Sequence, residues 1–194
     1  EQRIASIAFD RADAIHAVSE FTKGVIKRDH GVSEIEIIPP SIDVGYFSRK
    51  EVEQHRQASD VFSISRLVER KNIKTLVNAW KSLNSSVRDG RKLKIAGEGP
   101  QFNSILNETD EDDDIKMLGW ISEDEKRDQL QESSVFVLPA SGEGYDLEGF
   151  GIVYLEAQAS GTPVIGSDKG GAPEAIGKAG VVLQNERDSV ELAN

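Results

Sequence analysis

Apolar and polar positions along this chain follow two different periods. Short runs rich in β-branched residues, among them Val61–Ile64 and Leu93–Ala96, predict buried strands. Between these two runs the apolar positions recur at helical spacing and predict a helix over residues 73–83. A strand, a helix and a second strand in this order are typical of a βαβ unit in a parallel sheet.

The same alternation continues to the end of the chain. Further helices are expected over residues 101–106, 123–131 and 151–159. Further strands are expected over residues 115–118, 135–138, 163–166 and 181–183. The sequence therefore predicts an α/β fold with a Rossmann-like, doubly wound parallel sheet.

The first part of the chain is interpreted as the end of another domain. Its expected elements are a strand over residues 14–18, a helix over residues 20–27 capped by Ser19, and a strand over residues 34–38. From Gly45 to Ser59 the chain becomes polar and loses its period, which predicts a linker. We therefore expect a domain tail (1–44), a linker (45–59) and a main domain (60–194) that is cut short at its C-terminus.

Composition limits the classes of partner. The net charge of −11 disfavours non-specific binding to nucleic acid, although solubility alone would explain the acid surplus. The chain has no cysteine, which excludes disulfides and thiolate metal sites and fits a reducing cytoplasm. No apolar run approaches the roughly 20 residues that span a bilayer. A cytoplasmic protein that binds no nucleic acid is the expectation.

The densest chemical signal is the segment from Glu148 to Glu156, which follows a strand and a Gly-rich loop and runs into a helix. Gly149 and Gly151 let a ligand approach the backbone, and free N–H groups at a helix start can bind phosphate oxygens. Eight helical steps would separate the two carboxylates by roughly 12 Å, which is too far for a glycosidase pair. The spacing suits hydroxyl groups at two ends of a long ligand such as a nucleotide sugar. Taken alone, two unrelated surface acids would explain the pattern equally well.

Two further loops are expected at the same edge of the sheet. Arg66 and Lys71 follow the first predicted strand and could bind a pyrophosphate without a metal, unless they belong to an ordinary exposed basic loop. Gly97 and Gly99 form a tight turn after the next strand, where a ligand could approach the backbone. Phe102 stands where a dinucleotide fingerprint needs its third glycine, so a redox Rossmann enzyme is not indicated.

Other signals carry little weight. The acidic run Asp112–Asp114 has the D-x-D form of a metal site, but its acidic neighbours favour a solvated loop. The three histidines, His16, His30 and His55, form no ligand pair at helical spacing. Neither a metal nor a cofactor is therefore expected, and no nucleophile elbow of the G-x-S-x-G form occurs.

Several motifs, in the right order, resemble those of glycosyltransferase family four, whose members have two Rossmann-like domains in the GT-B architecture. The matching segments are Ala12–Ser19, Ile38–Asp43, Ser65–Leu67 with Lys71, Leu93–Pro100, Leu118–Ile121, Glu148–Glu156 and Gly161–Val164. The resemblance covers most of the chain. It implies that residues 60–194 are the C-terminal, donor-binding half of a retaining hexosyltransferase that transfers mannose, glucose or another hexose from a nucleoside-diphosphate sugar.

The resemblance also implies a role for each matching residue. Arg66 and Lys71 would bind the donor diphosphate, and Glu148 would bind the donor sugar and count with them as catalytic. The remaining donor-binding positions would be Gly97, Gly99, Ile121 at the base, Phe150 and Gly151 at the sugar, and Glu156 at the ribose. Transfer would retain the anomeric configuration and need no metal.

Two departures from the family pattern are local. Asn72 replaces a glycine after Lys71, and Pro40-Ser41 replaces Asn-Gly. The family's acceptor-side glycine-rich loop and active-site histidine belong to an N-terminal domain that we expect to be the missing partner, so this chain alone is expected to transfer nothing. That domain could also bring the protein to the inner face of the membrane. A non-hydrolysing sugar-nucleotide epimerase and a catalytically silent nucleotide-sugar-binding subunit remain as alternatives.

Overall fold

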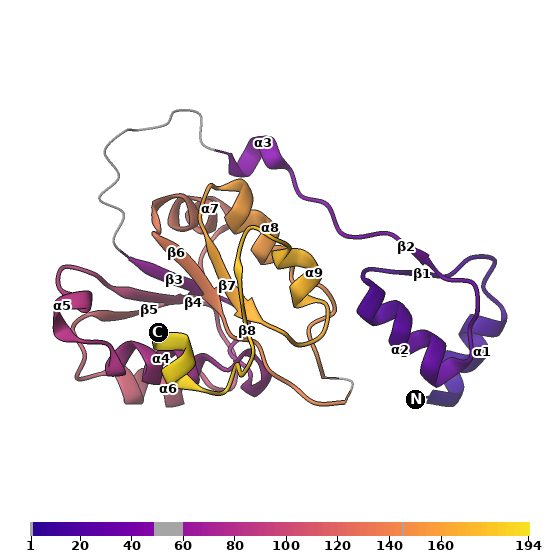
Figure 1. Ribbon diagram of the computed structural model, residues 1–194, viewed down its shortest axis with the longest axis horizontal. Coiled ribbons are helices and arrows are strands. Elements are labelled where there is room, and N and C mark those ends of the chain that lie inside the picture. Colours follow the sequence, from indigo (N-terminus) through magenta and orange to yellow (C-terminus); the bar gives the residue numbers. More distant parts are fainter. Residues whose placement is uncertain (1, 49–59, 145) are drawn as a thin grey trace.

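A computed structural model describes residues 2–48, 60–144 and 146–194. Its main body is a six-stranded sheet in the order β5-β4-β3-β6-β7-β8, in which every neighbouring pair is parallel (Figure 1). The strands are β3 (Val61–Ile64), β4 (Leu93–Ala96), β5 (Ile115–Gly119), β6 (Val135–Leu138), β7 (Val164–Ser167) and β8 (Val181–Leu183). The chain proceeds outward from β3 in one direction and then from β6 in the other, so the predicted doubly wound sheet is confirmed.

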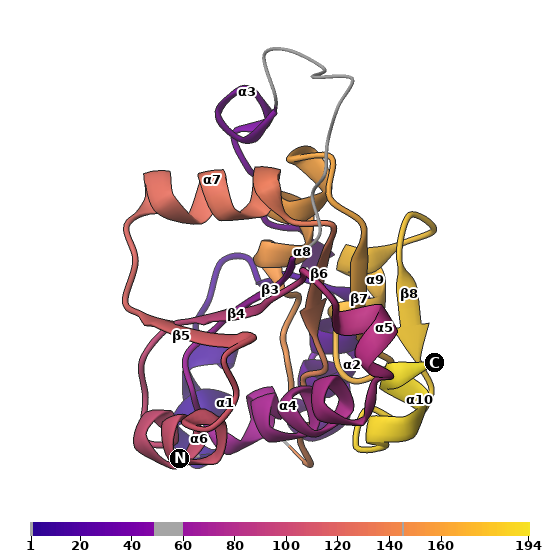
Figure 2. The same ribbon diagram turned by 90° about the vertical axis from the view of Figure 1, so that its left-hand side faces the viewer.

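Helices cover both faces of this sheet (Figure 2). One layer contains α4 (Ile73–Ser82), α6 (Phe102–Thr109) and α10 (Ser189–Ala193), and the other contains α7 (Glu123–Glu132), α8 (Ile152–Ala159) and α9 (Ala172–Ile176). The short helix α5 (Ser85–Arg88) and the 3₁₀ turn η1 (Glu69–Lys71) complete the main body. Because all strands are parallel, the loops that follow them gather at one edge of the sheet.

An aromatic stack fixes α8 on the sheet. The rings of Phe62 and Phe136 lie 6.3 Å apart, those of Phe136 and Tyr154 lie 5.9 Å apart, and all three side chains are buried. The Tyr154 hydroxyl donates a hydrogen bond of 2.6 Å to the Leu138 carbonyl, which satisfies a polar atom in the core. Burial, with a smaller contribution from the charge of Glu148, raises the pKa of Tyr154 well above its ordinary value. The tyrosine therefore stays a neutral donor and sets the position from which α8 presents Glu156.

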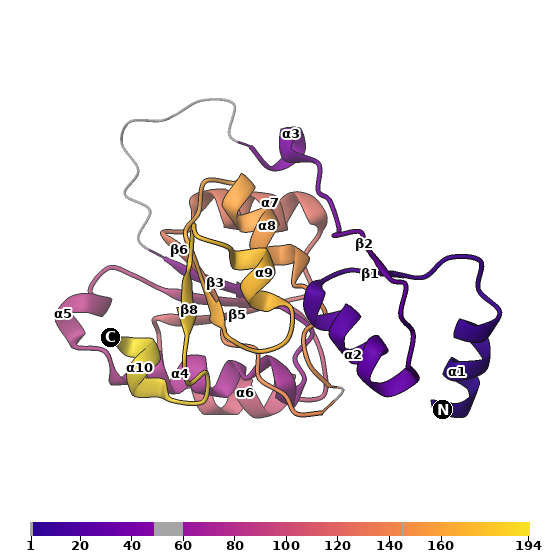
Figure 3. The same ribbon diagram turned by 45° about the vertical axis from the view of Figure 1, so that its right-hand side comes forward.

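The N-terminal segment contains α1 (Gln2–Asp10), β1 (His16–Ala17), α2 (Glu20–His30), β2 (Glu36–Ile37) and α3 (Val44–Phe47). β1 pairs only with β2, in parallel, within the described residues. Ser19 caps α2 as predicted by accepting a 3.0 Å hydrogen bond from the Thr22 amide. Figure 3 shows that the first turn of α2 lies beside the main body.

The structure corrects several predicted boundaries. The strands expected over residues 14–18 and 34–38 are two residues long in the structure. Within the described residues they pair only with each other, so no longer strand extends either of them. The helix α2 runs on to His30, and α1 was not predicted. The helix expected over residues 101–106 begins at Phe102 and extends to Thr109.

The segment expected to be an irregular linker begins with a helix. In α3, Asp43 caps the first turn by accepting a 3.0 Å hydrogen bond from the Tyr46 amide, and Phe47 is buried. Packing of Phe47 on the main body thus stabilises a turn that local hydrophobic periodicity does not reveal. The rest of the expected linker, residues 49–59, lies outside the described residues.

Candidate functional site

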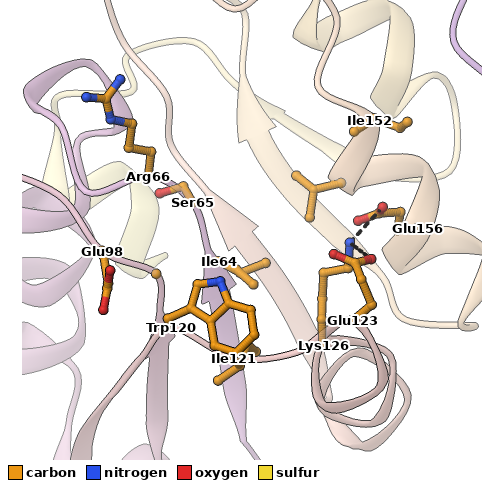
Figure 4. Close-up of a pocket in the computed structure, with 12 residues that line it drawn as sticks. Ile64, Ser65, Arg66, Glu98, Trp120, Ile121, Glu123, Lys126, Ile152 and Glu156 are labelled. Atoms are coloured by element: carbon orange, nitrogen blue, oxygen red, sulfur yellow. Dashed lines mark hydrogen bonds and ion pairs between the residues drawn. The ribbon is translucent and has the colours of Figure 1, made fainter.

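A pocket of about 450 Å³ opens where β3, β4 and β5 end, and α7 and α8 form its other wall (Figure 4). Four residues predicted to bind a ligand line it, namely Arg66, Gly97, Ile121 and Glu156. Figure 4 places Arg66 on one side of the pocket and Glu156, with Lys126 and Glu123, on the other. Glu98 lies on the same side as Arg66, so each wall of the pocket has both a cationic and an acidic group, which is suited to a long polar ligand.

Lys126 holds the Glu156 carboxylate in place. Its Nζ atom lies 2.9 Å from Glu156 Oε1 and 2.7 Å from Glu123 Oε2, and only 12% of the Lys126 side chain is exposed. Burial lowers the pKa of Lys126, but the hydrogen bonds that Lys126 donates to the carboxylates of Glu123 and Glu156 outweigh burial and raise the pKa above its ordinary value. Lys126 is therefore a charged partner of Glu156 at neutral pH.

The sequence analysis did not identify Lys126, and it gave no role to Trp120, which lies within the matching segment Leu118–Ile121. Lys126 is separated from Glu156 by 30 residues, and no local motif connects the two. Trp120 also lines the pocket and is 71% exposed. The position of a tryptophan directly after a predicted strand of a parallel sheet was the signal in the sequence that could have identified it.

Lys71 and Glu148, two of the three residues predicted to be catalytic, are paired with each other. They form a short ion pair in which the side chains are 11% and 16% exposed, and neither side chain is among those that line the pocket. Arg70, which was not predicted, adds a contact of 3.4 Å from Nη1 to Glu148 Oε2. Arg70 Nε also lies 3.1 Å from Asp146 Oδ1, so the predicted site is divided between the pocket and a neighbouring cluster of two cations and two carboxylates.

Asn72 explains how the Lys71 loop tolerates the loss of the family's glycine. Its φ angle is 56°, a left-handed conformation that glycine adopts freely and that asparagine adopts more readily than most residues. Its Nδ2 atom donates a 2.6 Å hydrogen bond to the Glu186 carbonyl, which fixes the turn. The turn after Lys71 therefore forms with asparagine in place of the family's glycine.

Gly97 and Gly99 allow two loops of the protein to approach each other. A Cβ atom on Gly97 would lie 1.9 Å from the Ser65 carbonyl oxygen, and one on Gly99 would lie 2.4 Å from the Leu67 carbonyl oxygen. The φ angles of these glycines are 113° and 156°. Approach of a ligand to the backbone was predicted at both positions, and the structure shows that the loop that carries Arg66 approaches both glycines.

Gly151 and Phe150 form the entrance to α8. Gly151 has a φ angle of 92°, and a Cβ atom there would lie 2.7 Å from the Tyr154 ring. Phe150 is 9% exposed and belongs to the hydrophobic core. The loop of residues 148–151 also contacts Gly171, whose amide donates a 2.8 Å hydrogen bond to the Glu148 carbonyl.

The first turn of α2 touches the same loop. Ser19 Oγ donates a 2.7 Å hydrogen bond to the Gly149 carbonyl. The Glu174 carboxylate, from α9, accepts hydrogen bonds of 2.8 and 3.0 Å from the amides of Glu20 and Phe21. The position of the Glu148–Gly151 loop therefore depends on residues before the main sheet.

The remaining candidates have structural partners. Asp112 pairs with Lys81 at 2.8 Å and Asp114 with Arg88 at 2.9 Å, as in a solvated loop. In the described ranges, no group of three or more histidine and carboxylate side chains is arranged to hold a metal ion. His55 lies outside those ranges.

No helix of the described chain has the length and apolarity needed to cross a membrane.

Comparison with known proteins gives a family match. Residues 47–194 match the family model for glycosyl transferases group 1. A GDP-mannose-dependent alpha-(1-6)-phosphatidylinositol monomannoside mannosyltransferase of Mycobacterium tuberculosis is 34% identical over 190 residues, which cover 90% of this chain and 49% of that protein. A GDP-mannose-dependent monoacylated alpha-(1-6)-phosphatidylinositol monomannoside mannosyltransferase of Corynebacterium glutamicum is 33% identical over 188 residues, with coverages of 89% and 49%. The chain spans about half the length of these curated relatives.

Solved structures share the fold. HepE of Anabaena in complex with UDP-glucose superposes with a TM-score of 0.82 at 19% identity, covering 99% of this chain and 55% of that one. The sucrose-phosphate synthase of Thermosynechococcus elongatus superposes with a TM-score of 0.78 at 22% identity, covering 99% and 50%. The chain thus has the fold of one half of a two-domain GT-B protein.

Proposed function

Because this chain belongs to the glycosyl transferases group 1 family, we propose that it is the donor-binding half of a retaining hexosyltransferase. The observation that carries the proposal is the pocket at the ends of β3, β4 and β5, where Arg66 and Glu156 lie at opposite walls. A nucleoside-diphosphate sugar has an anionic centre with hydroxyl groups at both ends, and this arrangement offers it a cation and a carboxylate acceptor.

Each part of the donor has a proposed partner. Arg66 and Lys71 bind the diphosphate, and Glu156 accepts hydrogen bonds from the ribose hydroxyls. Ile121 contacts the base, since it lines the same pocket as Glu156. Glu148 binds hydroxyls of the hexose from the loop that enters α8. A diphosphate at Lys71 must replace Glu148 as its partner, and this exchange leaves the Glu148 carboxylate able to bind the sugar.

We propose GDP-mannose as the donor. The support is that both curated relatives described above are GDP-mannose-dependent mannosyltransferases with at least 33% identity over about nine tenths of this chain. Binding of the acceptor, which is a lipid, a glycan or a protein, is proposed for the half of the protein that corresponds to the part of those relatives that this chain does not span. Transfer without a metal, in the cytoplasm at the inner face of the membrane, completes the proposal.

A thermal-shift panel of UDP, GDP, ADP and their sugar conjugates tests the donor. A ligand at 100 times its Kd stabilises the folded state by about 2.7 kcal/mol, which raises the melting temperature of a chain of this size by roughly 5–10 °C. A selective response to GDP and GDP-mannose is expected. A selective response to UDP would replace the proposed base, and no response to any of the nucleotides at millimolar concentration would contradict donor binding.

Lys71 provides the residue-level test. Lys71→Ala is expected to weaken GDP binding by about 1.5–3 kcal/mol, because it removes a charge-assisted contact. The matched control is Lys81→Ala, which removes a lysine whose partner Asp112 lies outside the site. Equal GDP affinities of the two variants in calorimetry would remove Lys71 from the site.

A further inference from the structure

Lys126 lies at the meeting point of three helices beside the pocket. It belongs to the first turn of α7, pairs with Glu156 of α8, and lies over the Phe47 ring of α3 with Nζ 5.5 Å from the ring centroid. No motif in the sequence assigns this residue a role. A buried lysine is costly unless its charge is paired, so its presence beside the pocket calls for a physical explanation.

The lysine and the glutamate depend on each other. The Glu156 side chain is 10% exposed and its carboxylate would lose its solvation without compensation if Lys126 were absent. Within residues 2–48, 60–144 and 146–194, Lys126 is the one side chain that donates a hydrogen bond to this carboxylate, and it does so at Oε1. One carboxylate oxygen is therefore occupied by the lysine, and Oε2 remains for a ligand.

Contacts within α7 and with α3 restrict the Lys126 side chain. Ser122 and Glu125 form a capping box that fixes the first turn of α7. Phe47, 5% exposed, packs under the Lys126 side chain, and Gln131 Nε2 donates a 2.8 Å hydrogen bond to the Phe47 carbonyl. These contacts leave Nζ little freedom, so the position of Nζ determines the position of Glu156 Oε1.

We propose that Lys126 is a positioning residue for ribose recognition: it fixes one oxygen of Glu156 and thereby orients the other toward the ribose hydroxyls of the donor. The inference rests on the proposed donor-binding function and deepens it. Lys126 acts through Glu156, so its removal should reduce the preference for a nucleotide with ribose hydroxyls more than it reduces binding of the base and phosphates.

The test compares GDP with 2′,3′-dideoxy-GDP in calorimetry, using the full-length protein that contains this chain. The wild-type protein is expected to prefer GDP by about tenfold or more, because hydrogen bonds to a charged group are at stake. Lys126→Met should reduce this preference to less than about threefold, and Lys126→Arg, which keeps a donor and the charge, should restore part of it. Lys81→Met, which removes a lysine far from the pocket, should leave the preference unchanged. Using the ratio cancels any general effect of lost positive charge on diphosphate binding.

The outcomes separate this inference from the proposed function. A wild-type preference that survives unchanged in Lys126→Met overturns the positioning role, as does an equal loss for both nucleotides, which would indicate direct phosphate contact. GDP binding without any wild-type preference overturns the ribose role of Glu156 while donor binding stands. Absence of GDP binding in the wild-type protein refutes the proposed donor and this inference with it. If circular dichroism shows that Lys126→Met is unfolded, Lys126→Gln gives the same comparison.

Discussion

Replacing Gly97 by alanine would test whether this glycine serves protein packing or ligand approach. A Cβ atom there would lie 1.9 Å from the Ser65 carbonyl oxygen, and real Cβ atoms essentially never approach closer than 3.0 Å. The loop that carries Arg66 would therefore have to move by 1.1 Å or more, the difference between 3.0 and 1.9. The φ angle of 113° adds backbone strain for any residue with a side chain.

Two effects determine how much Gly97→Ala lowers the free energy of unfolding. Strain in such a conformation costs about 1–3 kcal/mol. Movement of the loop that carries Arg66 weakens two backbone hydrogen bonds, from Ser65 N to the Ala96 carbonyl at 3.3 Å and from Leu67 N to the Glu98 carbonyl at 2.8 Å. At about 1 kcal/mol for each hydrogen bond, the expected loss in the free energy of unfolding, strain included, is roughly 3–5 kcal/mol.

Urea unfolding of Gly97→Ala and Gly161→Ala measures this loss. Gly161 is a matched control because its φ angle is 73° and a Cβ atom there would meet nothing within 4 Å. It should lose only about 1 kcal/mol, through backbone strain alone. If Gly97→Ala were as stable as Gly161→Ala and lost only its affinity for GDP, the packing explanation would be wrong and a direct ligand contact would replace it.

Four other predictions follow from contacts in the structure. Tyr154→Phe should lower the free energy of unfolding by about 1–3 kcal/mol in chemical denaturation, because the buried Leu138 carbonyl loses its 2.6 Å donor. Glu174→Ala should increase amide hydrogen exchange at the start of α2, which this carboxylate caps; unchanged exchange would show that the contact contributes nothing. Glu148→Gln should strengthen GDP binding and weaken the preference for GDP-mannose in calorimetry, since Lys71 loses its internal partner. The fold raises the pKa of Lys126 above its ordinary value of 10.5, so the stabilisation that Lys126 contributes is fully present below pH 10.5 and is lost as the pH rises through the folded-state pKa. The unfolding free energies of the wild-type protein and Lys126→Met should therefore converge at pH values above the folded-state pKa.

Sequence periodicity located the sheet better than it located the site. The predicted bounds of β3, β4, β6 and β8 agree with the structure. β3, β4 and β6 are short, mainly apolar runs enclosed between two helical layers, whereas β8 is an edge strand in which Val181 is 58% exposed. The helix α4 ends one residue before its predicted end. Its apolar stripe and the buried strands both follow from local sequence, so neither needed knowledge of distant contacts.

The site depended on contacts between distant residues. Lys71 and Glu148 are 77 positions apart, and Lys126 and Glu156 are 30 apart, so no local pattern could show that each pair meets. The roles of Gly97 and Gly99 were also hidden, because a glycine required by a neighbouring loop has the same sequence signature as one required by a ligand. Motif order predicted which residues gather at the sheet edge, and the structure adds which of them are already paired.

The hydrogen bond from Ser19 to the Gly149 carbonyl has a practical consequence for the choice of expression boundaries. The family match begins at residue 47, so a shortened chain could be designed to start at that position. Such a chain would lack Ser19 and the amides that bind Glu174, and it would also lose the residues that cap α3. A shortened chain that begins before α2 keeps these contacts, and the loop of Glu148 with them.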